Sequence, residues 1–95
     1  MKEEPILEHE KNYLFKKIVR GNFEEVIFDK NKHVLVAFVT DWCKHCKEIK
    51  PAFNEIKTIL KDDVKDIVFG IINVDKNDID INFKNFPTIY FYKKG

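Results

Sequence analysis

Two cysteines separated by two residues carry the clearest chemical potential in this sequence. They lie in the stretch Trp42-Cys43-Lys44-His45-Cys46-Lys47. The six residues before Thr40 are all apolar, and three of them are β-branched, which is typical of a strand buried on both faces. From Cys46 onward, apolar residues recur at helical spacing, at positions 46, 49, 52, 53, 56, 59 and 60. The two thiols are therefore predicted where a buried strand passes into a helix.

This placement favours thiol chemistry. Cysteines at i and i+3 in the first turn of a helix share one face and can reach each other to form a disulfide. The first turn also presents unpaired N–H groups and the positive end of the helix dipole, which stabilise a thiolate. Cys-x-x-Cys pairs in such a setting have thiol pKa values of about 3.5–7.5 instead of about 8.5. Positive charge from His45, Lys44 and Lys47 favours the same ionisation. We expect Cys43 to be the exposed nucleophile, Cys46 the resolving thiol one turn deeper, and His45 a stabiliser of the thiolate.

A metal site and a pair of inert core thiols are the alternatives. Zinc normally takes four ligands, and the remaining candidates, His9, His33 and His45, do not show the spacing of a second ligand pair. A redox pair is therefore the preferred interpretation, and no metal is expected.

Length and composition limit the remaining possibilities. A chain of 95 residues makes one domain, and 44% hydrophobic with 14% aromatic residues can fill a core. Lys+Arg 17 against Asp+Glu 16 is close to balance, which argues against a nucleic-acid partner. No apolar run is long enough to span a bilayer, and the charged residues 1–5 lack the apolar region of a secretory signal. We expect neither a nucleic-acid nor a membrane partner.

The elements around the cysteines alternate between strand and helix. Residues 1–12 are polar, contain Pro5 and show no period, so they are predicted to be a linker or tail. Residues 14–19 predict a first strand that ends before Gly21. Asn22 followed by Glu25 resembles a capping box at the start of a short helix.

The rest of the chain continues this alternation. We expect a central strand at 33–39, a long helix at 43–61 kinked by Pro51, a strand at 67–74, a loop at 75–82 with one helical turn around Ile79 and Ile81, and a strand at 88–92. Strands that are apolar throughout, alternating with helices, predict an α/β domain around a largely parallel sheet.

A strand is followed by Trp-Cys-x-x-Cys-Lys at the start of a helix, and later Phe86-Pro87-Thr88 leads into another strand. The order of these motifs resembles the thioredoxin fold. The resemblance implies a mixed central sheet flanked by helices, formed by residues 13–95. His45 before the second cysteine is similar to protein disulfide isomerases, where thioredoxins usually have proline. The stretches 21–26, 28–29 and 86–91 resemble the C-terminal catalytic domain of that family, and residues 4–6 resemble the linker that enters it.

The resemblance also implies a substrate site. Pro87 is expected to be a cis-proline that faces Cys43 across a groove and keeps metal ions off the thiols. The backbone of Phe86 would pair with an extended substrate segment, as in β-strand addition. Trp42 and Thr88 are expected on the rim of the same groove.

Three features depart from the family pattern. Ala37 stands where the family has a buried carboxylate, and residues 67–74 contain none of its partner lysine. Losing both partners avoids a stranded buried charge, but it predicts slow turnover because Cys46 must ionise without a carboxylate. The segment 75–87 is about one helical turn shorter than usual. The family continues beyond the position of Gly95 with an edge strand, a helix and an arginine, so we expect a domain incomplete at its C-terminus that exposes apolar surface.

Taken together, the sequence predicts a thiol–disulfide oxidoreductase acting on unfolded or disulfide-containing proteins. The Cys43–Cys46 pair would need no further cofactor, and glutathione or a partner oxidase would exchange electrons with it. The resemblance implies the endoplasmic reticulum lumen and further thioredoxin-like domains in a longer parent chain. Two alternatives remain open: a weakly redox-active, chaperone-like module that binds polypeptides, and a cytosolic thioredoxin-like reductase.

Overall fold

The computed structural model describes residues 3–7, 15–60 and 66–95. Their elements are, in chain order, β1 (Lys16–Ile18), a 3₁₀ turn (Arg20–Asn22), α1 (Phe23–Ile27), β2 (His33–Val39), a second 3₁₀ turn (Cys46–Glu48), α2 (Ile49–Leu60), β3 (Ile67–Asn73) and β4 (Thr88–Tyr92). The predicted strands and the two predicted helices are confirmed, most with shifts of one or two residues at their ends, but the long helix expected from residue 43 begins at Ile49. Leu14 and Lys61, at two of the predicted ends, lie outside the described residues.

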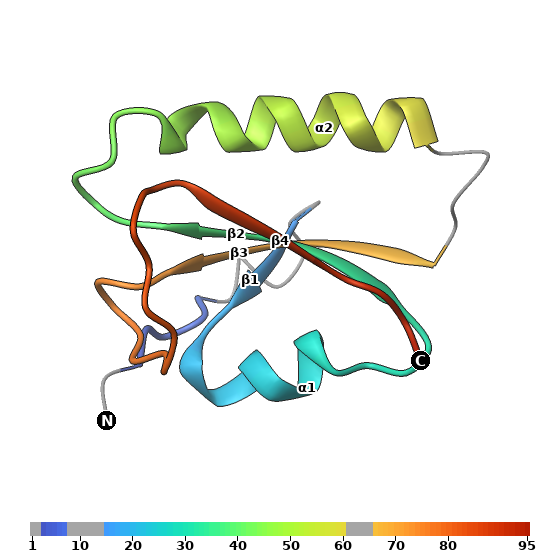
Figure 1. The fold of residues 1–95 in the computed structure, drawn as a ribbon, viewed down its shortest axis with the longest axis horizontal. Coiled ribbons are helices and arrows are strands. Elements are labelled where there is room, and N and C mark those ends of the chain that lie inside the picture. The colour runs from blue at the N-terminus through green and yellow to red at the C-terminus, as the bar shows by residue number, and fades with distance from the viewer. Residues whose placement is uncertain (1–2, 8–14, 61–65) are drawn as a thin grey trace.

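The strands form one mixed sheet, which confirms the predicted architecture. Its order is β1-β3-β2-β4, with β3 parallel to β1 and β2, and β4 antiparallel to β2. Helix α2 lies along one face of the sheet and α1 covers the other (Figure 1). Val39 pairs with Asn73 and Phe38 pairs with Thr88, so the C-terminal ends of β2 and β3 and the first residue of β4 lie at the same end of the sheet.

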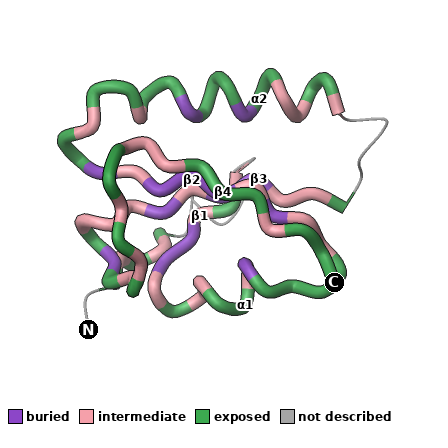
Figure 2. The backbone as a smooth tube through the Cα atoms, viewed as in Figure 1, coloured by how far each residue is buried: buried purple, intermediate pink, exposed green. Residues whose placement is uncertain are grey.

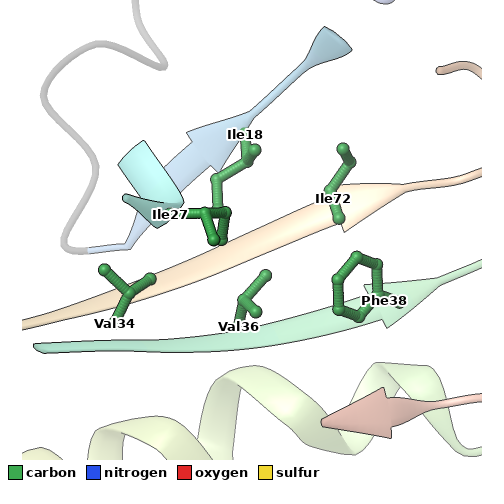
Figure 3. Packing of buried hydrophobic residues seen from close by; sticks show 6 residues of the cluster. All are labelled: Ile18, Ile27, Val34, Val36, Phe38 and Ile72. Atoms are coloured by element: carbon green, nitrogen blue, oxygen red, sulfur yellow. The ribbon is translucent and has the colours of Figure 1, made fainter. Parts of the chain in front are cut away.

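Strand β2 supplies both hydrophobic cores, which explains its continuous apolar sequence. Val34, Val36 and Phe38 pack with Ile18, Ile27 and Ile72 on the α1 face (Figure 3). Ala37 packs with Ile49, Phe53 and Phe69 on the α2 face. Because successive side chains of a strand point to opposite faces, a strand covered on both sides must be apolar at every position. The buried residues accordingly concentrate in the sheet and on the inner sides of the helices (Figure 2).

Asn22 does not cap α1 as the sequence predicted, because its side chain makes no cap hydrogen bond there. Its Oδ1 accepts the N–H of Val19 at 2.8 Å, and its Nδ2 donates to the carbonyl of Lys17 at 3.3 Å. Asn22 therefore closes the 3₁₀ turn that precedes the helix.

Helix α2 begins later than predicted. The segment 41–45 turns the chain from the end of β2 onto the α2 face (Figure 1), a 3₁₀ turn starts at Cys46, and the α-helix starts at Ile49. Cys43 therefore precedes the helix, and its expected place in the first turn is wrong. Pro51 falls in the first turn of α2 and not in its interior, and a missing N–H costs little near a helix start.

The buried side chain of Asn77 holds the described N-terminal residues against the domain. Its Oδ1 accepts the N–H groups of Glu4 and Arg20, both at 2.9 Å, and its Nδ2 donates to the carbonyl of Asn73 at 2.9 Å. A salt bridge of 2.8 Å joins Glu4 to Lys17. Residues 3–7, which the sequence placed in a linker, therefore contact β1 and the loop after β3.

The loop at 74–87, all of which the structure describes, contains turns but no helix, so the predicted helical turn around Ile79 and Ile81 is wrong. These two side chains and Phe83 instead pack against the core on the α1 face. Burial of the apolar side chains therefore orders the loop without backbone hydrogen bonds of a helix. Among the described residues, no helix has the length and apolar character needed to cross a membrane.

Strand β4 forms one edge of the described sheet, and part of its apolar surface is exposed. Ile89 and Phe91 are 48% and 56% exposed. They pair with Ala37 and Leu35 of β2, which belong to the cluster on the α2 face. The exposed side chains of β4 therefore lie on the α2 face of the sheet, in a part of that face that α2 does not cover.

The packing of α2 gives a first prediction, on stability. Phe53 is 1% exposed and contacts the rings of Phe15 and Phe69, with centroid separations of 6.2 and 5.4 Å. Phe53→Ala should lower the free energy of unfolding by about 3–5 kcal/mol, because it removes a buried ring and leaves a cavity. Ile59→Ala, on the exposed side of the same helix, should change it by less than about 0.5 kcal/mol. Urea denaturation measures both, and equal losses in the two variants would contradict this packing.

Residues near the end of the chain are fixed to the start of β3 by an ion pair. The Nζ of Lys94 donates to the carboxylate of Asp66 at 2.9 Å. This hydrogen bond and the positive charge of Lys94 lower the pKa of Asp66 below its ordinary value of 3.8. The pair therefore contributes stability above about pH 3.8, and this contribution is lost as the pH falls through the lowered pKa.

Lys94→Met should return the pKa of Asp66 towards 3.8, because the variant removes both the donor and the charge. Titration of the Asp66 carboxyl carbon by NMR measures the change. Lys93→Met, one residue earlier, is the matched control and should leave the titration of Asp66 in place. A midpoint that does not respond to Lys94→Met would show that the ion pair does not persist in solution.

Candidate active site

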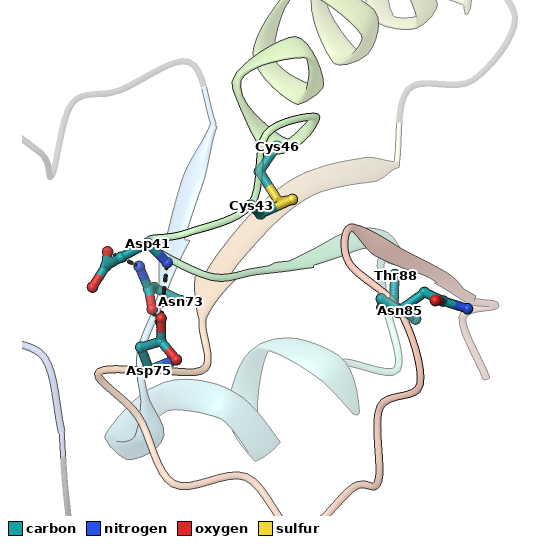
Figure 4. The surroundings of a disulfide bond; sticks show 7 residues. All are labelled: Asp41, Cys43, Cys46, Asn73, Asp75, Asn85 and Thr88. Atoms are coloured by element: carbon teal, nitrogen blue, oxygen red, sulfur yellow. Dashed lines mark hydrogen bonds between the residues drawn. A yellow bond between two sulfur atoms is a disulfide. The ribbon is translucent and has the colours of Figure 1, made fainter.

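The structure joins the two cysteines. Cys43 and Cys46 form a disulfide, and their Cα atoms are 5.4 Å apart, within the range that disulfides require (Figure 4). The spacing in the sequence therefore correctly predicted that the two thiols can bond. Both cysteines are partly buried in this oxidised form, so burial does not separate an exposed from a buried sulfur. The assignment of Cys43 as nucleophile stays a prediction.

The residues between and beside the cysteines are exposed and mostly cationic. Lys44, His45 and Lys47 all lie at the surface. His45 directly precedes the 3₁₀ turn, and its carbonyl accepts the N–H of Glu48 at 3.1 Å. The imidazole therefore lies on the segment that carries both sulfurs.

A second segment lies beside Trp42 and brings the predicted substrate residues together. The Phe86–Pro87 peptide bond is cis, as the resemblance implied. The ring of Phe86 meets the indole of Trp42 edge to face, with centroids 5.7 Å apart, and Trp42 remains 69% exposed. The hydroxyl of Thr88 donates to the carbonyl of Asn85, which closes the turn before β4 (Figure 4). Trp42, which directly precedes Cys43, thus touches the segment that carries Phe86, Pro87 and Thr88; we call these four residues the rim.

Aromatic contacts fix this rim to the core. Phe86 packs on Phe83 at 5.5 Å between centroids, and Phe83 packs on the buried Phe38 at 4.7 Å. A chain of rings therefore runs from the α1-face core to the exposed indole of Trp42. Rings of this kind hold each other in preferred geometries, which gives the rim a defined shape.

The buried position of β2 that carries an acid in the resembling family is apolar here. Ala37 is completely buried and pairs with Ile71 of β3 and Ile89 of β4. Its neighbours in the cluster are Ile49, Phe53 and Phe69. A carboxylate would be costly in such surroundings without a partner, so alanine fits this core.

Three polar residues that the sequence reasoning missed lie at the base of the loop that carries Cys43 (Figure 4). The N–H of Asp41 donates to Oδ2 of Asp75 at 2.9 Å, and Nδ2 of Asn73 donates to Oδ1 of Asp41 at 2.8 Å. The N–H of Asp75 donates to Oδ1 of Asn73 at 2.8 Å. The signal in the sequence was available: polar residues follow two apolar strands, and parallel strands end at the same edge of a sheet.

Of the two histidines that the structure describes, His45 lies between the cysteines and His33 makes its contacts elsewhere. Nδ1 of His33 accepts the N–H of Lys94 at 3.1 Å, and its ring stacks on Phe91 at 5.6 Å. His9 lies outside the described residues. Within residues 3–7, 15–60 and 66–95, no three His, Cys, Asp or Glu side chains come together in a group that could hold a metal ion.

The fold and the disulfide site define the class of protein. The family model described as Thioredoxin matches residues 14–95, and the chain therefore belongs to the thioredoxin family.

Within that family the chain is similar to protein disulfide isomerases. It is 36% identical over 97 aligned residues to protein disulfide isomerase-like 1-3 of Oryza sativa subsp. japonica, covering 100% of this chain and 17% of that protein. It is 39% identical over 80 residues to the protein disulfide-isomerase of Drosophila melanogaster, covering 83% and 16%. It is 36% identical over 81 residues to that of Gallus gallus, covering 84% and 16%. The chain thus spans less than a fifth of the length of these relatives.

The Trp42–Phe86 contact gives a prediction specific to this rim. Trp42 is the single tryptophan of the chain, so its fluorescence reports on this site alone. Phe86→Ala should shift the emission to longer wavelength and increase quenching by acrylamide, because it removes the ring that covers one edge of the indole. Phe91→Ala, an exposed ring of β4, should leave the spectrum unchanged. An emission that Phe86→Ala does not alter would show that the two rings are apart in solution.

Proposed function

We propose that this chain is a thiol–disulfide oxidoreductase of the protein disulfide isomerase type. One observation carries the proposal: Trp42, which directly precedes the Cys43–Cys46 disulfide, touches Phe86, whose peptide bond to Pro87 is cis. A disulfide that can be exchanged and a neighbouring segment that could hold a polypeptide together support this activity. The similarity to protein disulfide isomerases supports the same activity.

Oxidation of a substrate proceeds in two exchanges. A substrate thiolate attacks Sγ of Cys43, the Cys43–Cys46 bond breaks, and Cys46 leaves as a thiolate that takes up a proton. A second substrate thiolate then attacks the substrate sulfur of the mixed disulfide, and Cys43 leaves as a thiolate. Two substrate thiols become one disulfide, and the protein disulfide becomes a dithiol. In isomerisation the Cys43 thiolate attacks a wrong substrate disulfide, and Cys46 releases adducts that persist.

The remaining site residues serve these exchanges. His45, which lies between the two cysteines, stabilises the thiolate of Cys43 more than the disulfide, which makes the pair a better oxidant. Trp42, Pro87 and Thr88 form the surface against which an extended substrate lies, and the backbone of Phe86 pairs with it.

Departure of Cys46 is the difficult step. Its thiolate needs a proton, and the apolar surroundings of Ala37 offer no carboxylate to carry one. Without a carboxylate at position 37 we expect solvent to supply or remove the proton, which supports the expectation of slow turnover.

The proposed partners follow from the same chemistry. Substrates are unfolded or disulfide-containing proteins, and glutathione or a partner oxidase exchanges electrons with Cys43 and Cys46 without a further cofactor. The greater length of the relatives supports a longer parent chain with further thioredoxin-like domains. An oxidising compartment such as the endoplasmic reticulum lumen suits this activity.

A chaperone-like binding module is the second candidate, and exposed apolar side chains favour it. Trp42, Ile89 and Phe91 present apolar surface near the site and on β4, while Ala37 weakens the redox step. Such a module would bind unfolded chains whether or not its cysteines react.

Insulin reduction by the wild type and by Cys43→Ser distinguishes these functions. If the protein is an oxidoreductase, Cys43→Ser should reduce its activity at least about 100-fold, because the variant lacks the sulfur that is proposed to attack the substrate disulfide. Ile59→Ala is the control, since its side chain is exposed on α2, away from the disulfide. Suppression of aggregation that survives Cys43→Ser, with no measurable reduction by the wild type, would favour the binding module.

Equilibration in glutathione buffers then separates an isomerase from a reductase. Protein disulfide isomerases have reduction potentials near about −180 mV, and thioredoxin has one near about −270 mV. A value near the first supports the proposed function. A value near the second would replace it with the thioredoxin-like reductase.

A further inference from the structure

Asn73 connects the ends of two parallel strands to the loop that carries Cys43. It is the last residue of β3 and pairs with Val39, the last residue of β2. Its side chain donates to the carboxylate of Asp41 and accepts the N–H of Asp75, both at 2.8 Å. Asp75 in turn accepts the N–H of Asp41 at 2.9 Å. We call these three residues the Asn73 network.

The Asn73 network restrains Asp41 at both its main chain and its side chain. Asp41 is two residues before Cys43, so these bonds determine how the loop leaves the sheet. In Figure 4 the Asp41 side chain points away from the two sulfurs. The network therefore acts on the position of Cys43 and not on the sulfur directly.

Asn73 is itself held on the side opposite the loop. Its carbonyl accepts the side-chain amide of the buried Asn77 at 2.9 Å and the N–H of Lys76 at 3.3 Å. The neighbouring Val74 donates its N–H to Val39 at 2.9 Å. Asp41 is therefore bonded to a part of the fold that has little freedom to move.

We propose that Asn73 is a positioning residue for the redox pair, which it serves by holding Asp41 so that Cys43 stays within bonding reach of Cys46 when both are reduced. This proposal rests on the proposed oxidoreductase function. A loop already held in the bonding geometry loses less conformational freedom when the disulfide closes. The effective concentration of one thiol at the other is correspondingly higher.

The direction of the effect depends on which redox form the network restrains. In the oxidised form the disulfide itself restrains the loop, so losing the Asn73 network changes that form little. In the dithiol form the network restrains the loop beside the Trp42–Phe86 contact, so its loss gives the loop freedom that closure must remove. Removing the network should make the disulfide less stable relative to glutathione.

Equilibration of the full chain with glutathione measures this stability. One glutathione disulfide and the protein dithiol give the protein disulfide and two glutathione thiols, so two electrons and two protons pass to glutathione. Asn73→Ala should lower the equilibrium constant about three- to tenfold, the scale expected for one or two hydrogen bonds. This fold-change corresponds to a rise of about 14–30 mV in reduction potential. Asn54→Ala, an exposed position on α2, is the matched control and should change nothing.

Exchanging the side chains of positions 41 and 73 tests whether the hydrogen bond between them causes the change in the equilibrium constant. Asn73→Asp alone sets two carboxylates against each other at 41 and 73, and it should lower the equilibrium constant at least as much as Asn73→Ala. The double variant Asp41→Asn/Asn73→Asp restores one donor and one carboxylate in the opposite order. It should recover the wild-type equilibrium constant within about twofold. Thermal unfolding of each variant separates this rescue from a general gain of stability.

The outcomes are distinct. A lowered equilibrium constant in both single variants, with recovery in the double variant, supports the positioning role. Unchanged constants in folded single variants would overturn it, as would a double variant no better than Asn73→Asp alone. If Asn73→Ala does not fold, the comparison of Asn73→Asp with the double variant decides. A wild-type protein that does not exchange with glutathione would instead contradict the proposed function itself.

Discussion

Burial of β2 on both faces is the constraint on which the rest of this structure depends. Val34, Val36 and Phe38 fill one core, and Ala37 belongs to the other. A strand covered on both sides cannot shift its register, because a slip by one residue would exchange the two sets of side chains. The end of β2 is therefore fixed in space, and with it the point from which the loop to Cys43 leaves the sheet.

The site is assembled at this fixed end from three separate stretches of chain. The loop after β2 brings the disulfide, the turn before β4 brings Phe86 and the cis-proline, and the end of β3 brings Asn73. The aromatic rings that join Trp42 to Phe38 continue the core out to the surface. A reactive sulfur pair and a rigid rim therefore depend on the same packing that stabilises the domain.

At position 37 this chain departs from the pattern of the family that it resembles. The disulfide, the cis peptide and the mixed sheet agree with the family, whereas Ala37 and its neighbours in the α2-face core are apolar. A buried carboxylate here would speed proton transfer but would cost stability unless it had a partner. With alanine at this position the core avoids that cost. The polar groups near the cysteines instead lie at the surface, where they hold the loop by hydrogen bonds.

The sequence alone determined the elements and the reactive pair, because both are encoded by local pattern. The apolar run of β2, the helical period of α2 and the Cys-x-x-Cys spacing required no knowledge of distant contacts. Tertiary structure decided what depends on residues far apart in the chain. Asn22 closes a 3₁₀ turn instead of capping α1, Cys43 precedes the helix because the chain must first turn over the sheet edge, and Ile79 and Ile81 are ordered by burial without a helix. Asn73 acquires its role only because β2 and β3 are parallel and end together, which places it against Asp41, 32 positions away.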